Sequence, residues 1–248
     1  MDLICYERKS DSPFVERIWR SHSGNGGAFL SMSDSHWGMV LTRYRGKTTL
    51  TIRGPETVAT PAYSPADAEF IGIQFKAGVF MPYIPVGLVL NRKDLNLPEA
   101  SNNSFWLNSS SWQFPDFENA DTFIEWLVHD GLLVCDPIVN AFFKKQPIDM
   151  SLRTIQRRLV QVTGLTSIVT QQIERARYAT SLIIQGSSIT DTISQAGYFD
   201  QSHLIRSLKR FVGLTPTQID DKNRPERLSF LYNTDFIHQD KMLIPNSE

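Results

Sequence analysis

Two stretches near the end of the 248-residue chain carry polar side chains suited to hydrogen bonding with DNA bases. In the first, Arg153, Gln156 and Arg157 lie close together at the start of an expected helix. Arginine pairs bidentately with guanine, and glutamine with adenine, in the major groove. The second carries Gln201, Ser202, His203, Arg206, Lys209 and Arg210. No nucleophile or carboxylate is placed to work with His203, so base or phosphate contact is expected there rather than proton transfer.

A helix over residues 151–164 would position the first set. Ser151 is a candidate N-cap and Gly164 a candidate C-terminal stop. Its apolar residues recur at i, i+4 and i+7 and predict one buried stripe, formed by Ile155, Leu159 and Val162. The polar set then falls on the opposite side. An ordinary amphipathic surface helix with basic residues remains an alternative.

The second set follows a short helix, a glycine turn and another capped helix. Ser187 or Ser188 caps Ile189–Ala196, Gly197 breaks it, and Asp200 caps a helix that ends before Gly213. The buried stripe of this last helix is Leu204, Leu208 and Phe211. This is the plan of a helix-turn-helix. Thr215-Pro216 starts one more short helix.

An uninterrupted helical stretch, Thr170–Gln185, connects the two units. It would be about 24 Å long at about 1.5 Å per residue. Two reading helices in one chain can then enter successive faces of the major groove, about 34 Å apart. Such a duplicated reader does not require a dimer.

Charge is divided unevenly along the chain. Residues 144–219 hold ten Lys and Arg against four Asp and Glu, whereas residues 1–143 hold eleven against sixteen. Eight carboxylates and no Lys or Arg occur from Asp94 to Phe143. The basic block favours an anionic partner, with a solvated basic face as the alternative.

The first hundred residues are expected to be rich in strands. Met39–Thr42 and Thr48–Ile52 predict a hairpin around Arg45-Gly46-Lys47, and Glu56–Thr60 with Glu69–Phe75 a second pair. Residues 80–90 suggest a short helix, and the Ser- and Asn-rich residues 98–116 a loop. Helical spacing begins near Asn119: Asp121 is expected to cap a helix, and Asp136-Pro137 to start another that Pro147 closes.

Composition excludes several classes of protein. Hydrophobic residues are 41% and charged residues 21% of the chain, which does not fit a disordered or fibrous protein. Cys5 and Cys135 are the only cysteines, too few for a disulfide scaffold or a four-cysteine zinc site. No membrane span or signal peptide is recognised, so a cytoplasmic location is expected. His22 and His36 lack clustered ligands, and neither a metal nor a cofactor is expected.

Residues 197–216, from Gly197 through Asp200-Gln201-Ser202-His203 to Thr215-Pro216, resemble the C-terminal signature of the AraC/XylS transcription regulators. The likeness extends back through Ser151–Leu159 and Ile173–Arg177 and covers roughly residues 137–219. It implies a seven-helix DNA-binding domain with two helix-turn-helix units, and base readers at the positions already named. It also implies an N-terminal domain that senses an effector, mediates dimerisation, or both.

Three departures from the family pattern stand out. Pro147 falls in Lys144–Asp149, where the family has a regular supporting helix, so that helix must be shorter or its turn remodelled. The first unit is therefore expected to read bases less well than the second. Ser194 replaces a usual alanine, and Ile219-Asp220 replaces a customary aromatic-arginine ending.

The resulting expectation is an α+β protein: a β-rich regulatory domain (1–117), a helical linker (118–136), the DNA-binding domain (137–221) and a tail (222–248). The expected function is a sequence-specific DNA-binding transcriptional regulator, not an enzyme, acting as a monomer or homodimer. Its partner is double-stranded DNA, with a small-molecule effector and RNA polymerase left open. The alternatives make the N-terminal half a protein-interaction module or an enzyme. Six aromatic residues could line an effector pocket or simply form core: Trp19, Trp37, Tyr44, Phe70, Phe75 and Phe80.

Overall fold

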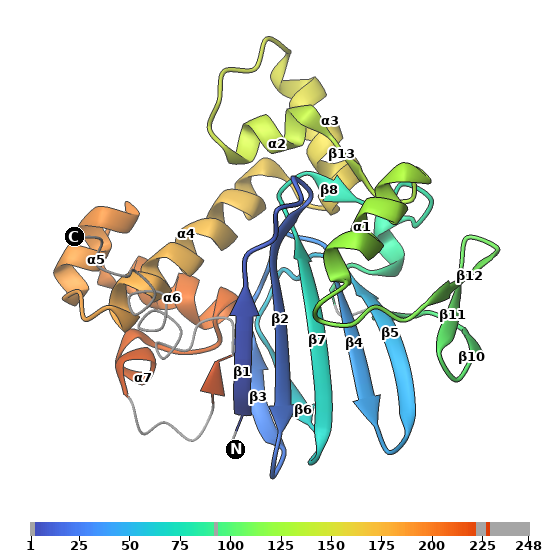
Figure 1. Cartoon of the computed structure of the whole chain (residues 1–248). Coiled ribbons are helices and arrows are strands. Elements are labelled where there is room, and N and C mark those ends of the chain that lie inside the picture. The colour runs from blue at the N-terminus through green and yellow to red at the C-terminus, as the bar shows by residue number, and fades with distance from the viewer. Residues whose placement is uncertain (1–2, 92–93, 222–226, 229–248) are drawn as a thin grey trace, which may run out of the picture. The chain divides into compact units, whose positions relative to one another are not determined.

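Strands occupy most of the first 113 residues and helices most of the later ones, in a computed structural model that describes residues 3–91, 94–221 and 227–228 (Figure 1). The α+β expectation is therefore confirmed. The strands are β1 (Leu3–Arg8), β2 (Val15–Ser23), β3 (Gly27–Ser31), β4 (Gly38–Tyr44), β5 (Lys47–Arg53), β6 (Thr60–Ser64), β7 (Ala68–Phe75), β8 (Val79–Phe80), β9 (Leu95–Asn96), β10 (Glu99–Ser101), β11 (Ser104–Leu107), β12 (Ser110–Gln113), β13 (Val134–Cys135) and β14 (Arg227–Leu228). The helices are the 3-10 turn η1 (Val86–Leu88), α1 (Ala120–His129), α2 (Pro137–Phe143), α3 (Leu152–Thr163), α4 (Ser167–Ile184), α5 (Ile189–Ala196), α6 (Gln201–Phe211) and α7 (Pro216–Asp220).

The described residues divide into two compact units that interleave along the chain. Among the described residues, the first unit comprises residues 3–27, 34–56, 64–91 and 94–170, and the second comprises residues 28–33, 57–63, 171–221 and 227–228. The division passes through the start of α4, so α3 belongs to the first unit and α6 to the second. Each helix-turn-helix candidate is thus packed with a different part of the β-rich half.

A six-stranded antiparallel sheet, in the order β1-β2-β7-β4-β5-β9, dominates the first unit (Figure 1). The hairpin predicted around Arg45-Gly46 is confirmed. Arg45 and Gly46 have positive φ angles of 50° and 76°, which match the strand twist of a hairpin with a two-residue turn.

The two faces of this sheet differ in chemistry. One face is apolar and carries Ile18, Ile73, Met39 and Ile52 in one row across four strands. This face shares one hydrophobic cluster with the buried side of α1, formed by Phe123, Ile124 and Leu127. The opposite face places Trp19 beside Gly72 and then Val40 and Thr51.

Three expectations for the β-rich half were wrong. Residues 98–116 are not a loop, since β10, β11 and β12 form a small sheet there. Ser and Asn residues form the turns of this sheet, and in one of these turns Asn108 and Ser109 have positive φ. The second predicted strand pair does not form: residues 56–59 are not a strand, β6 begins only at Thr60 and lies beside β3, and β7 pairs with β2 and β4. Between residues 80 and 90 only the three-residue turn η1 is helical.

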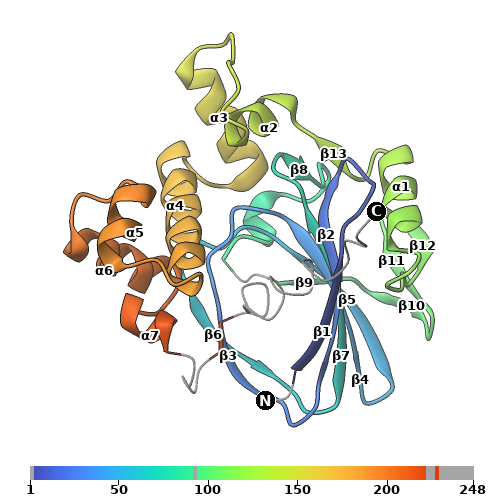
Figure 2. The same ribbon diagram turned by 60° about the vertical axis from the view of Figure 1, so that its left-hand side comes forward.

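In the second unit, β14, β3 and β6 form a three-stranded sheet. Figure 2 shows α5, α6 and α7 beside the later turns of α4. The predicted buried side of α4 is confirmed for Ile173, Ala176 and Ala179. The predicted tail, residues 222–248, lies outside the described residues except for β14, which runs parallel to β3 with Leu228 opposite Leu30. Within the described ranges, no helix combines the length and apolar character needed to cross a membrane.

Candidate nucleic-acid interface

Helix α6 has the buried and exposed faces that its sequence predicts. The Asp200 side chain accepts a hydrogen bond from the His203 backbone amide at 2.6 Å and caps the helix. Its buried stripe is Leu204, Leu208 and Phe211. The predicted readers on its exposed side are Gln201, Ser202, Arg206, Lys209 and Arg210. His203 is only partly exposed, because its ring packs edge-on against Tyr198 at a centroid distance of 5.0 Å.

The turn before α6 is held by local contacts. Ser188 caps α5 through the Asp191 amide, and Gly197 ends α5 with a left-handed φ of 69°. Tyr198 is buried, and its hydroxyl lies 2.9 Å from the Ser207 hydroxyl on α6. Burial raises the pKa of Tyr198 above its ordinary value.

The last turn of α6 is anchored to segments from the β-rich half. The Ser33 amide and hydroxyl both donate to the Phe211 carbonyl at 2.8 Å, and the Ala59 amide donates to the Arg210 carbonyl at 2.9 Å. A helix leaves its final carbonyls without partners inside the helix, and these donors satisfy two of them. Nothing in the sequence indicated contacts between residues so far apart.

Helix α3 likewise begins and ends as predicted. The Ser151 hydroxyl accepts from the Thr154 amide at 3.2 Å, and Gly164 closes the helix with a φ of 68°. Ile155, Leu159 and Val162 are buried. The exposed side carries the three predicted readers and two apolar side chains: Arg153, Gln156, Arg157, Leu152 and Val160.

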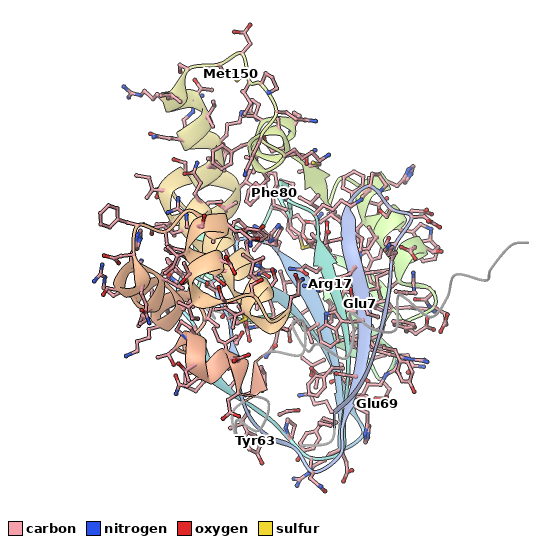
Figure 3. All side chains as sticks on the ribbon, turned by 90° about the vertical axis from the view of Figure 1, so that its left-hand side faces the viewer. Glu7, Arg17, Tyr63, Glu69, Phe80 and Met150 are labelled. Atoms are coloured by element: carbon pink, nitrogen blue, oxygen red, sulfur yellow. The ribbon has the colours of Figure 1, made fainter. Side chains whose placement is uncertain are left out.

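No helix directly precedes α3. Residues 144–151 are not helical, and Met150 lies on this connection (Figure 3). Residues 137–221, all of them described, therefore contain six α-helices where the family resemblance implies seven. The physical reason is Pro147, whose ring and missing amide hydrogen oppose a regular helix.

Other contacts hold α3 in place of that helix. Helix α2 packs on it through Val139, which clusters with the buried stripe of α3. The Arg158 guanidinium lies 2.6 Å from the Asp136 carboxylate, which also caps α2 through the Ile138 and Val139 amides. The Trp37 indole nitrogen donates to the Val162 carbonyl at 2.7 Å. Sequence reasoning identified Asp136 as a cap but missed its ion pair and the role of Trp37.

The remaining candidate sites are less organised. The described residues hold no cluster of three or more His, Cys, Asp or Glu side chains that could bind a metal ion. His36 lies 2.7 Å from the Asp34 carboxylate, and His22 is exposed. Of the aromatic residues weighed as pocket or core, Trp37 and Phe75 lie in the hydrophobic core. Phe80 packs against that core, whereas Tyr44 and Phe70 are partly exposed.

Comparison with known protein families matches residues 147–222 to the family described as a helix-turn-helix domain, of the AraC type. These residues contain α3 to α7 and both sets of predicted readers. Residues 147–222 form an AraC-type helix-turn-helix domain. A chain with such a domain is a DNA-binding transcriptional regulator. No curated protein matches the chain, and no solved structure matches it.

The AraC-type domain begins at Pro147, where the helical support for α3 is absent. Its second half keeps the full pattern of supporting helix, glycine turn and capped reading helix in α5 and α6. Its first half keeps the reading helix α3. The support for this helix comes instead from α2 and Trp37, which both lie outside residues 147–222. Base contact by either reading helix remains a prediction, as does the distance between them.

Proposed function

We propose that this chain is a sequence-specific transcriptional regulator whose helices α3 and α6 read bases in the major groove. The β-rich half modulates that binding through a small-molecule effector or through dimerisation. The observation that carries the proposal is α6: a capped helix in the AraC-type domain whose exposed side is formed by polar and basic side chains. Recognition helices place their N-terminal residues against base edges, which is where Gln201 and Ser202 lie.

Binding to DNA should weaken steeply with salt. Residues 144–219 carry a net charge of +6, and neutralising about 6–8 phosphates releases their condensed counterions. We expect log K to fall against log salt with a slope of roughly −5 to −7. Titration of a labelled duplex at several salt concentrations measures this slope. A slope near zero would show that the chain does not function by binding nucleic acid.

Lys209 should position the backbone rather than read bases. It is exposed in the last turn of α6, away from the N-terminal residues that face base edges. Lys209→Ala is expected to weaken binding to specific and random DNA about equally and to reduce the salt slope by about 1. Competition between the selected site and random DNA, repeated across salt concentrations, checks both effects. A change in base preference would show that α6 lies in the groove in another orientation.

The face of the six-stranded sheet that carries Trp19 supports the proposal of an effector site in the β-rich half. Thr42, Thr49 and Thr51 are partly exposed on the face that carries Trp19. Ser21, on the same face, has a buried hydroxyl without a hydrogen-bond partner. Such a face offers a neutral molecule hydroxyl groups beside an aromatic ring. Melting shifts of the full chain against a metabolite set, compared with Ser21→Ala and Thr42→Val, test this assignment.

A protein-interaction role is the second candidate for the β-rich half. Trp106 on β11 and Trp126 on α1 are exposed, and both lie in the segment that holds eight carboxylates and no Lys or Arg. Exposed aromatic residues are enriched at protein interfaces. If no metabolite shifts the melting temperature of the full chain, this role replaces the effector role.

A further inference from the structure

Helix α3 differs from α6 in the side chains that it exposes. Leu152 is the first residue of α3 and is 78% exposed, although transfer of a leucine side chain out of water is favourable. Val160, two turns later, is exposed as well. On α6 the exposed residues are all polar or charged: Gln201, Ser202, Arg206, Lys209 and Arg210. The two reading helices therefore present different chemistry.

The position of Leu152 relates it directly to a predicted reader. Residues four apart on a helix are neighbours on one face, so Leu152 lies beside Gln156. The Ser151 cap fixes the first turn that carries Leu152, and the ion pair of Arg158 with Asp136 holds the helix from its other side. Leu152 thus stands at the N-terminal end of a firmly held reading helix, the end that meets base edges.

Base pairs differ in whether they offer an apolar group in the major groove. Thymine alone carries a methyl group there, at C5, and adenine offers the N6 and N7 pair that glutamine recognises. An adenine-reading glutamine beside an exposed leucine therefore suits A·T base pairs. We infer that Leu152 reads a thymine methyl next to the base contacted by Gln156, so that α3 selects an A·T-containing step.

This inference rests on the proposed DNA-reading function and is tested with duplexes that lack only the methyl group. The full chain first selects its site from random DNA, and the half-site whose preference Gln156→Ala removes is assigned to α3. Deoxyuridine then replaces thymidine within that half-site. Because one buried methyl group contributes about a fourfold change in affinity, wild-type Kd should rise about fourfold on this replacement. The Leu152→Ala variant should bind both duplexes with equal Kd.

Leu88→Ala provides the matched control, since Leu88 is 55% exposed and lies outside the AraC-type domain. It should keep the fourfold ratio. A half-site without thymine, a wild-type ratio of one, or a ratio that persists in Leu152→Ala would each overturn the role of Leu152 while leaving the DNA-reading function intact. If the full chain selected no preferred sequence from random DNA, both the proposed function and this inference would be wrong.

Discussion

Replacing Arg206 with alanine is expected to weaken binding to the specific DNA site by about 1–3 kcal/mol, a factor of roughly 5 to 150. The residue is exposed on α6, whose cap, turn and last carbonyls all have partners. Its guanidinium can pair bidentately with one guanine, so preference at one base position should relax. Selection from a random DNA pool with wild type and variant measures that preference.

Arg157→Ala on α3 should cost no more than Arg206→Ala. In a helix-turn-helix the first helix crosses the DNA backbone and fixes the docking, and α3 has no helix directly before it. Arg43→Ala serves as a control, because Arg43 is an exposed arginine on β4 outside the AraC-type domain. If Arg157→Ala abolished base preference while Arg206→Ala left it unchanged, the ranking of the two helices would be reversed.

Gly72→Ala is expected to lower the free energy of unfolding by about 3 kcal/mol, a large fraction of the stability of an ordinary domain. A Cβ atom at this position would stand 1.9 Å from Cε2 of Trp19, whose indole lies over the glycine. Strand β7 is hydrogen-bonded on both sides, to β2 and β4, so its backbone cannot move away. Chemical denaturation of the full chain, followed by circular dichroism, measures the loss.

Two further variants separate this clash from a general effect of alanine. Nothing lies within 4 Å of a Cβ placed at Gly87, so Gly87→Ala should change stability by less than about 0.5 kcal/mol. In a Trp19→Leu background the indole is gone, and Gly72→Ala should then cost under about 1 kcal/mol. An equal loss in both backgrounds would show that Trp19 is not the obstacle.

Local signals explain why the reading helices were predictable. The caps Ser151 and Asp200, the glycines 164 and 197, and the apolar spacing all act within one or two turns of a helix. The same reasoning identified Pro147 as a break in the supporting helix. It failed at residues 98–116, because Ser and Asn also occupy tight turns between short strands.

The contacts that hold the reading helices could not be predicted in the same way. Trp37 and Val162 are 125 residues apart, and Ser33 and Phe211 are 178 apart. In the sequence, Trp37 resembles any core aromatic residue and Ser33 any loop serine. The partner of a backbone carbonyl depends on how distant segments pack, which composition and periodicity do not encode.

The donors at Trp37 and Ser33 also bear on how this protein can be recombined with others. A chimera joined at residue 147 would transplant the AraC-type domain but leave behind Trp37, Asp136, Ser33 and Ala59. The grafted helix α3 would lose its indole donor and its ion pair, and α6 would lose the donors to its last carbonyls. Because these anchors lie in separate stretches of the N-terminal half, swapping only residues 28–33 and 57–63 removes the anchors of α6 and leaves those of α3 in place. The natural module for exchange is therefore a reading helix together with the N-terminal segments that anchor it, rather than the contiguous C-terminal third of the chain.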